Sequence, residues 1–495
     1  MTLEGLAPAL LVGAVIVLVC VLGVRFAGRL GVPGLLLYLL LGLVLGTVFP
    51  PLSVEDPGLA SVLGYAALVL ILAQGGLTTR VDQLRPVMWP AIALASVGVV
   101  VSIAVVATPL ILFGVPTQTA LLIGTVLAAT DAAAVFSVLR GLRVKTRVRT
   151  LLEAEAGFND APVVVLVTVL AGTSLEASTW WHIPLQVVAE LIGGAVVGLA
   201  IGYFGRWLLP RLALPAVGLY PIAALALLVA AYGLADVLHT SGFLAVYIAA
   251  IIIGSTARLP HRRSIVGFAD GLSWIAEIGL FFMLGALADI AGLPAALPLA
   301  LVVAAVILVL ARPIASVVSL VPCRLPWPTI AFTSIAGLRG AVPIVFAAIA
   351  LGLAVPDARL IFDVTLIAVL ILLLIQVPLI RFGGRRLGIV TDEEAVELDV
   401  ESAPLDGMHA QVLGFEVPAR SGLVGTFVPE IGLPEGAVVS LVVRDGTAIA
   451  PDANTRIRAG DRVLVVSTEE VRAATEARML AVARRGRLAA WLEGS

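Results

Sequence analysis

Three ionisable side chains, Asp131, Asp160 and Arg339, interrupt apolar stretches of the chain and are the first candidates for chemistry. At a rise of about 1.5 Å per residue, they lie about 14, 15 and 16 Å from the expected inner ends of their stretches. Two carboxylates and one guanidinium would then meet at one level, near the middle of a membrane. Ionisable groups at that depth are energetically costly and usually mark a path for ions or protons.

A second group of polar residues surrounds the second carboxylate. Glu155 and Asn159 are one helical turn apart, and Asp160 follows directly. A buried carboxylate is unfavourable unless it is protonated, paired with a cation or bound to an ion. We expect Arg339 to neutralise Glu155, which leaves Asp160 to hold either a proton or a metal cation. Since one carboxylate cannot hold both, the two would exclude each other, and this is the chemistry of antiport.

The sequence around the other two residues favours interrupted helices. Asp131 follows Thr130 and precedes three alanines, and Arg339 lies in the motif Gly-Leu-Arg-Gly-Ala-Val-Pro of residues 337–343. Small residues and proline at midspan permit broken helices, and the opposite directions of the two segments fit inverted repeats. A carboxylate near helix N-termini and a cation near helix C-termini would compensate the helix dipoles, and Asp131 and Arg339 have these signs.

Membrane-spanning helices are the elements that must position these residues. The 495 residues are 60% hydrophobic and 13% charged, whereas soluble domains carry roughly 25% charged residues. Apolar segments recur as far as about residue 380, which predicts an all-α polytopic membrane protein with about thirteen spans and broken crossing helices. The net charge of -2 gives no basic excess for nucleic acid, and two cysteines provide neither a disulfide framework nor a thiolate metal cluster. We expect no cofactor.

The basic residues predict the topology. They gather in every second loop, most densely between Arg140 and Arg149, and again after the last span at Arg381, Arg385 and Arg386. By the positive-inside rule, the N-terminus lies outside the cytoplasmic membrane and the C-terminus inside. Arg312 is expected near the inner end of its span, with its side chain snorkelling to the interface.

The composition changes after the membrane domain, which we place at residues 1–386. Residues 387–405 indicate an acidic linker, and residues 406–472 contain short Val, Leu and Ile runs that are typical of strands, including 438–443 and 463–466. Residues 473–495 indicate a helical tail. The sequence therefore predicts a small α+β cytoplasmic domain.

The membrane domain resembles the monovalent cation:proton antiporter superfamily, in its bacterial NhaP-type, cell-volume-regulation branch. The motifs that carry the resemblance are Thr130-Asp131, the segment 155–160 and the segment 337–343. It implies that Asp160, Asn159, Thr130 and Asp131 bind the cation and the proton, with Asp160 and Thr130 contacting the metal cation. It also implies electroneutral exchange of K+ or Na+ for H+, an ion pair of Glu155 with Arg339, and a homodimer in the lipid membrane. Relatives often have Ser at Ala156, and some have Glu near Gln74.

The C-terminal domain resembles the TrkA-C, or RCK C-terminal, module. The similar residues are Leu433-Pro434, Pro451 and the turns 444–446 and 460–462. The resemblance implies regulation of transport by a small ligand bound to residues 406–472.

Two other classes of function are open. One is a passive cation channel gated by the cytoplasmic module, although the sequence has no carbonyl filter of the TVGYG kind. The other is a polytopic membrane enzyme, but no nucleophile or metal motif of the membrane peptidases is present. Proton-coupled exchange in vesicles separates the three classes.

Overall fold

The structure is a computed structural model of the whole chain. It describes residues 11–23, 34–48, 56–140, 142, 144–172, 182–256, 259–390, 400–405, 410–418, 421–444, 446–468 and 470–486. The chain divides into two compact units, Met1–Val390 and Thr391–Ser495, and each is described by itself.

The first unit is helical, as the sequence predicts. Its first described helix is Leu11–Gly23. The helices that follow are α2 (Gly34–Val48), α3 (Pro57–Thr78), α4 (Val81–Leu84), α5 (Met88–Ala93), α6 (Val99–Leu112), α7 (Thr117–Val126), α8 (Ala132–Arg140), α9 (Thr146–Gly172), α10 (His182–Leu208), α11 (Leu219–Val237), α12 (Gly242–Gly254), α13 (Arg262–Leu287), α14 (Leu293–Val306), α15 (Arg312–Leu320), α16 (Trp327–Ala336), α17 (Ala341–Gly352) and α18 (Ala358–Arg386).

Many of these helices are able to span a membrane. Among the described residues, eight helical segments are long and apolar enough, and the pair α16 and α17, bent by 49°, raises the number to nine. Four shorter apolar helices of 10–17 residues accompany them: Leu11–Gly23, α2, α7 and α12. A polytopic membrane fold is thereby confirmed, while the total of thirteen spans stays a prediction.

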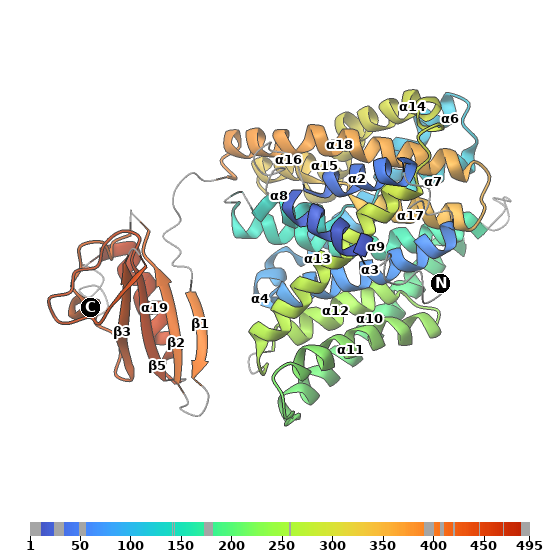
Figure 1. The fold of residues 1–495 in the computed structure, drawn as a ribbon. Helices are drawn as coiled ribbons and strands as arrows, with labels where there is room; N and C mark the ends of the chain where they lie inside the picture. The colour runs from blue at the N-terminus through green and yellow to red at the C-terminus, as the bar shows by residue number, and fades with distance from the viewer. Residues whose placement is uncertain are drawn as a thin grey trace. The chain divides into compact units, whose positions relative to one another are not determined.

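Helix α9, which carries Glu155, Asn159 and Asp160, lies inside this unit (Figure 1). Of its most apolar stretch, 78% is buried by protein, against 22% for the span that contains α10. Gly157 brings α12 close to this helix, because a Cβ at this position would overlap the ring of Tyr247. The polar residues of α9 are therefore surrounded by other helices and kept away from lipid tails.

Two spans are interrupted in the middle. The chain leaves the helix between α7 and α8, around Thr130, and again between α16 and α17, around Arg339. Two further spans contain a π-helical turn, at Leu94–Gly98 and at Ile307–Ala311. Such irregularities cluster at functional sites, and their occurrence in pairs is what inverted repeats predict. The breaks lie where the sequence indicated them.

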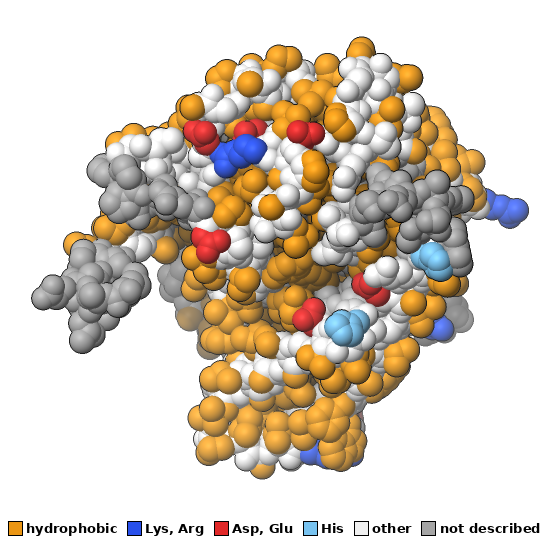
Figure 2. All heavy atoms as spheres, turned by 90° about the vertical axis from the view of Figure 1, so that its right-hand side faces the viewer, with side chains coloured by type: hydrophobic (Ala, Val, Ile, Leu, Met, Phe, Trp, Pro, Cys, Tyr) orange, Lys and Arg blue, Asp and Glu red, His pale blue; other side chains and the backbone are white. Residues whose placement is uncertain are grey.

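The surface of the membrane unit is mostly apolar. Figure 2 shows a face on which hydrophobic side chains predominate, while charged side chains are few and mostly acidic. Many large apolar side chains are also exposed along the helices of this unit, which suits contact with lipid tails.

The second unit is built around a five-stranded antiparallel sheet in the order β1-β2-β5-β3-β4. Its core contains Leu413, Phe415, Val463 and Val465, together with Met479 of the covering helix. The predicted α+β fold is confirmed, and the predicted strands fall within β3 and β5. The elements are β1 (Val400–Leu405), β2 (Ala410–Glu416), β3 (Ala437–Arg444), β4 (Thr447–Ile449), β5 (Arg462–Thr468) and α19 (Arg472–Arg485).

The segment 387–405, indicated as a linker, has structure at both ends. Residues up to Val390 belong to the membrane unit, and β1 pairs with β2 from Val400 to Leu405. Pro404 is compatible with β1 because β1 is an edge strand. The acidic residues 392–394, like residues 487–495 of the predicted tail, lie outside the described residues.

Asp461 anchors the start of β5. It is fully buried and accepts hydrogen bonds from Nε and Nη2 of Arg444, at 2.8 and 2.7 Å, and from the backbone N–H of Arg458 at 2.7 Å. Burial alone would raise the pKa of Asp461, but the hydrogen bonds from Arg444 and Arg458 outweigh it and lower the pKa below its usual range. The charged carboxylate therefore stabilises this unit at neutral pH.

Asp461→Asn is expected to lower the free energy of unfolding of this unit by about 2–3 kcal/mol at pH 7. Because the pKa is lowered in the folded state, the contribution is complete above the ordinary value near 4 and is lost as pH falls through the lowered value. Urea unfolding of the whole chain, followed by protease sensitivity of residues 400–486 at several pH values, measures it. A deficit that stays constant with pH would contradict this reading.

Candidate ion and proton site

Asp131 lies at the N-termini of two half-helices. Its Oδ1 accepts a hydrogen bond from Ala134 N in the first turn of α8, at 3.2 Å, and its Oδ2 accepts one from Ala341 N, the first residue of α17, at 2.6 Å. Its own N–H donates to Leu338 O at 2.9 Å. One buried carboxylate thus meets the N–H groups of two helix ends whose dipoles favour negative charge.

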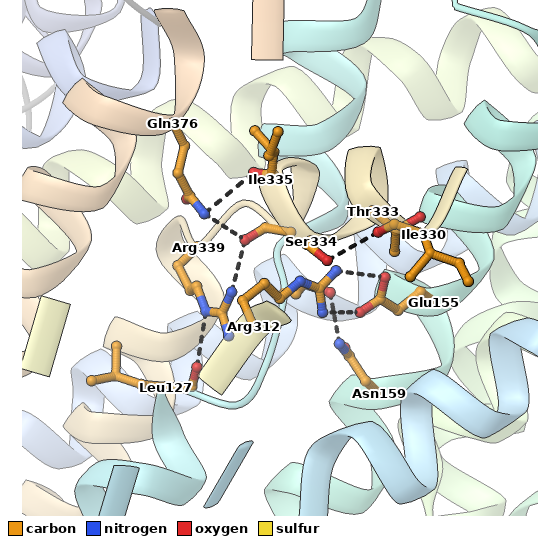
Figure 3. Close-up of polar contacts among 12 residues, drawn as sticks. Leu127, Glu155, Asn159, Arg312, Ile330, Thr333, Ser334, Ile335, Arg339 and Gln376 are labelled. Carbon is orange, nitrogen blue, oxygen red and sulfur yellow. Dashed lines mark hydrogen bonds and ion pairs between the residues drawn. The ribbon is translucent and has the colours of Figure 1, made fainter. Parts of the chain in front are cut away.

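Arg339 has the complementary position at two C-termini. Its Nε donates to Leu127 O, just after α7, at 3.0 Å, and its Nη1 donates to Gly337 O, just after α16, at 2.8 Å (Figure 3). A cation is favourable there because free carbonyls and the negative end of the dipole meet at a C-terminus. Asp131 and Arg339 therefore have the signs that the dipole argument predicted.

Gln376 of α18 contributes to the same C-terminus, a role that the sequence analysis missed. The side chain is fully buried, and its Nε2 donates to Gly337 O at 3.2 Å and to Ile335 O at 3.5 Å (Figure 3). An amide side chain in the last apolar span was the only signal available. It provides hydrogen bonds without adding charge.

Thr130 and Asn159 meet between the first break and α9. Nδ2 of Asn159 donates to Oγ1 of Thr130 at 2.6 Å, and both side chains are buried. Asp160 is also buried and lies within electrostatic range of Asp131. Among the described residues, Oδ1 of Asn159 and Oδ1 of Asp160 have no hydrogen-bond partner. Two consecutive residues of α9 therefore each have a buried acceptor oxygen without a donor in the described part of the chain.

Glu155 is paired with Arg312, so its expected pairing with Arg339 is wrong. The two oxygens of Glu155 accept from Nη1 and Nη2 of Arg312 at 2.5 and 2.8 Å (Figure 3). Both side chains are buried, with 2% and 4% of their surfaces exposed. The expectation that Arg312 snorkels to the interface is therefore also wrong.

The position of Arg312 in its span explains both corrections. It is the first residue of α15, about 12 Å before the end of that helix at Leu320, so its guanidinium reaches the depth of Glu155. A π-helical turn directly precedes it and changes the register of the side chains that follow. The guanidinium of Arg339 is meanwhile engaged by backbone carbonyls, and that of Arg312 lies against Gly337 in the break.

Gln74 and Ala156 are the two positions at which the resemblance suggested a different side chain. Gln74 of α3 donates from Nε2 to Oδ1 of Asp270 in α13, at 3.3 Å. Ala156 is buried on α9 and offers no side-chain oxygen. Neither position therefore adds a free side-chain oxygen to those of Thr130, Asp131, Asn159 and Asp160.

The buried charges around the breaks nearly cancel. Asp131, Asp160 and Glu155 are acids, and Arg312 and Arg339 are bases. Three acids and two bases leave one negative charge when all are ionised. One proton or one monovalent cation at Asp160 brings the sum to zero, which makes either form compatible with a dry interior.

Gly340→Ala tests the role of Asp131 as a cap. A Cβ at this position would overlap Oδ2 of Asp131, so the carboxylate has to leave the N-terminus of α17. We expect a loss of about 1–2 kcal/mol in stability, the usual worth of a cap, together with slower exchange. Thermal unfolding in detergent measures the loss. Gly279→Ala in α13 is the control, since a Cβ there meets nothing within 4 Å; equal stability of the two variants would contradict the capping role.

The chain is similar to known proteins in sequence and in fold. The family model described as sodium/hydrogen exchanger, transmembrane, matches residues 14–382, and the TrkA-C domain model matches residues 412–480. The chain is 33% identical to the K(+)/H(+) antiporter NhaP of Alkalimonas amylolytica over 473 residues, which cover 94% of this chain and 82% of that protein. It is 31% identical to the K(+)/H(+) antiporter NhaP2 of Shewanella baltica, with 93% and 81% covered.

A solved structure has the same fold. The sodium proton antiporter MjNhaP1 from Methanocaldococcus jannaschii at pH 8 superposes with a TM-score of 0.66. The match covers 78% of this chain and 99% of that one, at 23% sequence identity. The likeness extends to the fold of the membrane unit.

Proposed function

Because the chain belongs to the sodium/hydrogen exchanger family, whose members are cation:proton antiporters, we propose that it exchanges one monovalent cation for one proton at Asp160. It is a membrane transporter rather than an enzyme. Asn159 and Thr130 complete the site in this proposal. The surrounding charged residues set the net charge of the site and hold the helix ends in place: Glu155, Arg312, Asp131 and Arg339.

One observation carries the proposal. Oδ1 of Asp160 and Oδ1 of Asn159, on consecutive residues of α9, are buried and have no donor among the described residues. Unsatisfied buried acceptors are costly, and a carboxylate more so, unless a proton or a cation occupies the place of the missing donor. Oγ1 of Thr130, 2.6 Å from Nδ2 of Asn159, adds a hydroxyl oxygen beside them. Oxygen ligands of this kind suit an alkali cation.

The charge sum supports electroneutral exchange. With a proton on Asp160, the buried acids and bases around the breaks add to zero, and with a cation bound to the ionised carboxylate they add to zero again. A single titrating acid sets a stoichiometry of one proton for one cation. Since both loaded forms are neutral, an imposed membrane potential has little to act on.

Potassium is the cargo that we expect first, with sodium second. The two relatives at 31–33% identity are named K(+)/H(+) antiporters, and a relative at 28% identity, from Synechocystis, is named a low-affinity Na(+)/H(+) antiporter. The ligands would be one carboxylate and neutral amide and hydroxyl oxygens. Such a set attracts a cation only moderately, which suits a large alkali ion such as K+.

The orientation and the regulation are part of the same proposal. The basic loops favour an N-terminus outside the cell membrane and residues 391–495 in the cytoplasm, and the sparse, mostly acidic charges of Figure 2 suit an outer face. Residues 412–480 match the TrkA-C model, so we propose that a small ligand bound there regulates exchange. A homodimer in the lipid bilayer completes the proposed assembly.

Reconstituted vesicles test the function. We expect K+ and Na+ gradients to drive proton movement in the opposite direction, at rates that do not change when a membrane potential is imposed. Li+ serves as the third cation in a comparison of selectivity. Cation flux without counter-moving protons would show that the protein is a channel and not an antiporter. A strong effect of the membrane potential on the rate would contradict one-for-one exchange.

A further inference from the structure

The chain folds back on itself where the last membrane helix ends. Gly388 has a φ of +63°, the left-handed conformation that glycine adopts most easily after a helix. The N–H groups of Ile389 and Val390 then donate to Gly384 O of α18, at 3.0 and 2.9 Å. We name residues 388–390 the return segment.

The return segment pairs with the loop between α8 and α9. Val390 forms an antiparallel bridge with Val144, and Lys145 N donates to Ile389 O at 3.2 Å. Ile389 and Val390 are buried. A Cβ on Gly384 would meet both Val390 and Phe332 of α16, so the segment packs against α16 and α18 as well.

The loop held in this way joins the two elements that form the ion site. Helix α8 begins at the cap provided by Asp131, and α9 carries Asn159 and Asp160. The contact of Asn159 with Thr130 spans the gap between them. The return segment also leads to the cytoplasmic unit, because Val390 is bonded directly to Thr391, the first residue of that unit.

We propose that the return segment transmits the state of the cytoplasmic unit to the ion site, with Ile389 and Val390 as positioning residues. A pull on residue 391 reaches Val390 first and changes its pairing with Val144. The loop then shifts α8 relative to α9, and with them the distance between Thr130 and the Asn159-Asp160 pair. This inference rests on the regulation proposed above and names the contact through which it acts.

One backbone donor makes the contact testable. Lys145→Pro removes the N–H that donates to Ile389 O, while Lys145 O, which accepts from Val148 N and Arg149 N, can still start α9. Lys145→Ala is the matched control, because it removes the charge and keeps the N–H. Each variant is made in the whole chain, alone and together with Asp461→Ala, which we expect to destabilise the cytoplasmic unit because it removes the buried acceptor of Arg444.

In the chain with its own Lys145 and in the Lys145→Ala chain, we expect Asp461→Ala to change the apparent KM for K+ by about fivefold or more. This is the usual size of an allosteric coupling. In the Lys145→Pro chain the same substitution should change the KM less than twofold, with the maximal rate preserved. An equal effect in all three chains would overturn the inference and leave the proposed regulation standing. An unfolded cytoplasmic unit, shown by proteolysis, without any change in transport would overturn both.

A cross-link gives an independent reading. Since Lys145 N bonds to Ile389 O, Val144 and Val390 form a non-hydrogen-bonded pair, with Cα atoms about 4.5 Å apart, which a disulfide tolerates. In a chain with Cys20→Ala and Cys323→Ala, oxidation of Val144→Cys/Val390→Cys is expected to abolish the effect of Asp461→Ala, and reduction to restore it. Failure to cross-link, or an undiminished effect after cross-linking, would overturn the inference. Each single cysteine variant, oxidised in the same way, is the control.

Discussion

Asp160→Asn is expected to reduce cation-driven proton movement to the level of empty vesicles, while the protein still folds and inserts. The substitution removes the titrating group with almost no change of shape. It also leaves the four other buried charges around the breaks, those of Asp131, Glu155, Arg312 and Arg339, with a sum of zero, so neither a proton nor a cation is needed there for neutrality. Reconstituted exchange with K+ and with Na+ measures the loss, and thermal unfolding in detergent confirms that the variant is folded.

Asp236→Asn is the matched control, since Asp236 is an exposed acid on α11, outside the site. We expect its exchange to equal that of the parent protein. Asp131→Asn provides a second comparison. The amide retains one capping oxygen and Asp160 can still titrate, but the loss of a buried negative charge weakens the binding of a proton or a cation, so we expect strongly slowed exchange that is not abolished. Normal exchange by Asp160→Asn would contradict the assignment of Asp160 as the residue that binds the proton and the cation.

The second large effect is expected at the ion pair of Glu155 and Arg312. Glu155→Gln leaves a buried guanidinium without its counter-charge, and Arg312→Gln leaves a buried carboxylate. Either change should cost about 3–5 kcal/mol of stability. Replacing both by Gln should recover most of this loss, because two neutral amides can bond to each other. Unfolding of the purified protein in detergent measures all three variants.

The pair Arg149 and Glu153 is the control, because it lies on the same helix α9 and has a similar contact of 2.8 Å, but Arg149 is 41% exposed. Its double replacement by Gln should cost less than about 1 kcal/mol. A comparable loss at both pairs would contradict the view that burial makes the inner pair essential.

The relative level of the buried charged residues, and the helix ends that suit each charge, could be predicted from the sequence. Counting residues from the inner ends of the spans brought Asp131, Asp160 and Arg339 to one level, because helix rise is constant. The dipole argument then gave Asp131 to the N-termini and Arg339 to the C-termini, and the hydrogen bonds agree. The local rules succeed here because each concerns only one helix and its ends.

Contacts between helices were harder to predict. The partner of Glu155 depends on the register of α15, which a π-helical turn shifts just before Arg312. Nothing in hydropathy shows such a turn. A charge count would have helped, because three buried acids around the breaks call for more than one base. The bond from Gln376 to Gly337 O depends on how α18 packs on the break, which periodicity does not reveal.

Short pairings at the ends of elements were also invisible. The edge strand β1 lies in a stretch with a proline and a glutamate, and its strand character comes from pairing with β2. The bridge of Val144 with Val390 joins residues far apart in the chain. Both depend on tertiary contacts that override local propensity.

Release of protons on cation binding tests the central claim most directly, because it needs no membrane and no turnover. Purified protein in weakly buffered detergent is titrated with K+, at a pH where Asp160 is protonated, and the pH is recorded. We expect the parent protein to release close to one proton per K+ bound, and Asp160→Asn to release none. Binding of K+ without release of a proton would show that the two occupy separate places, and would contradict exchange at a single carboxylate.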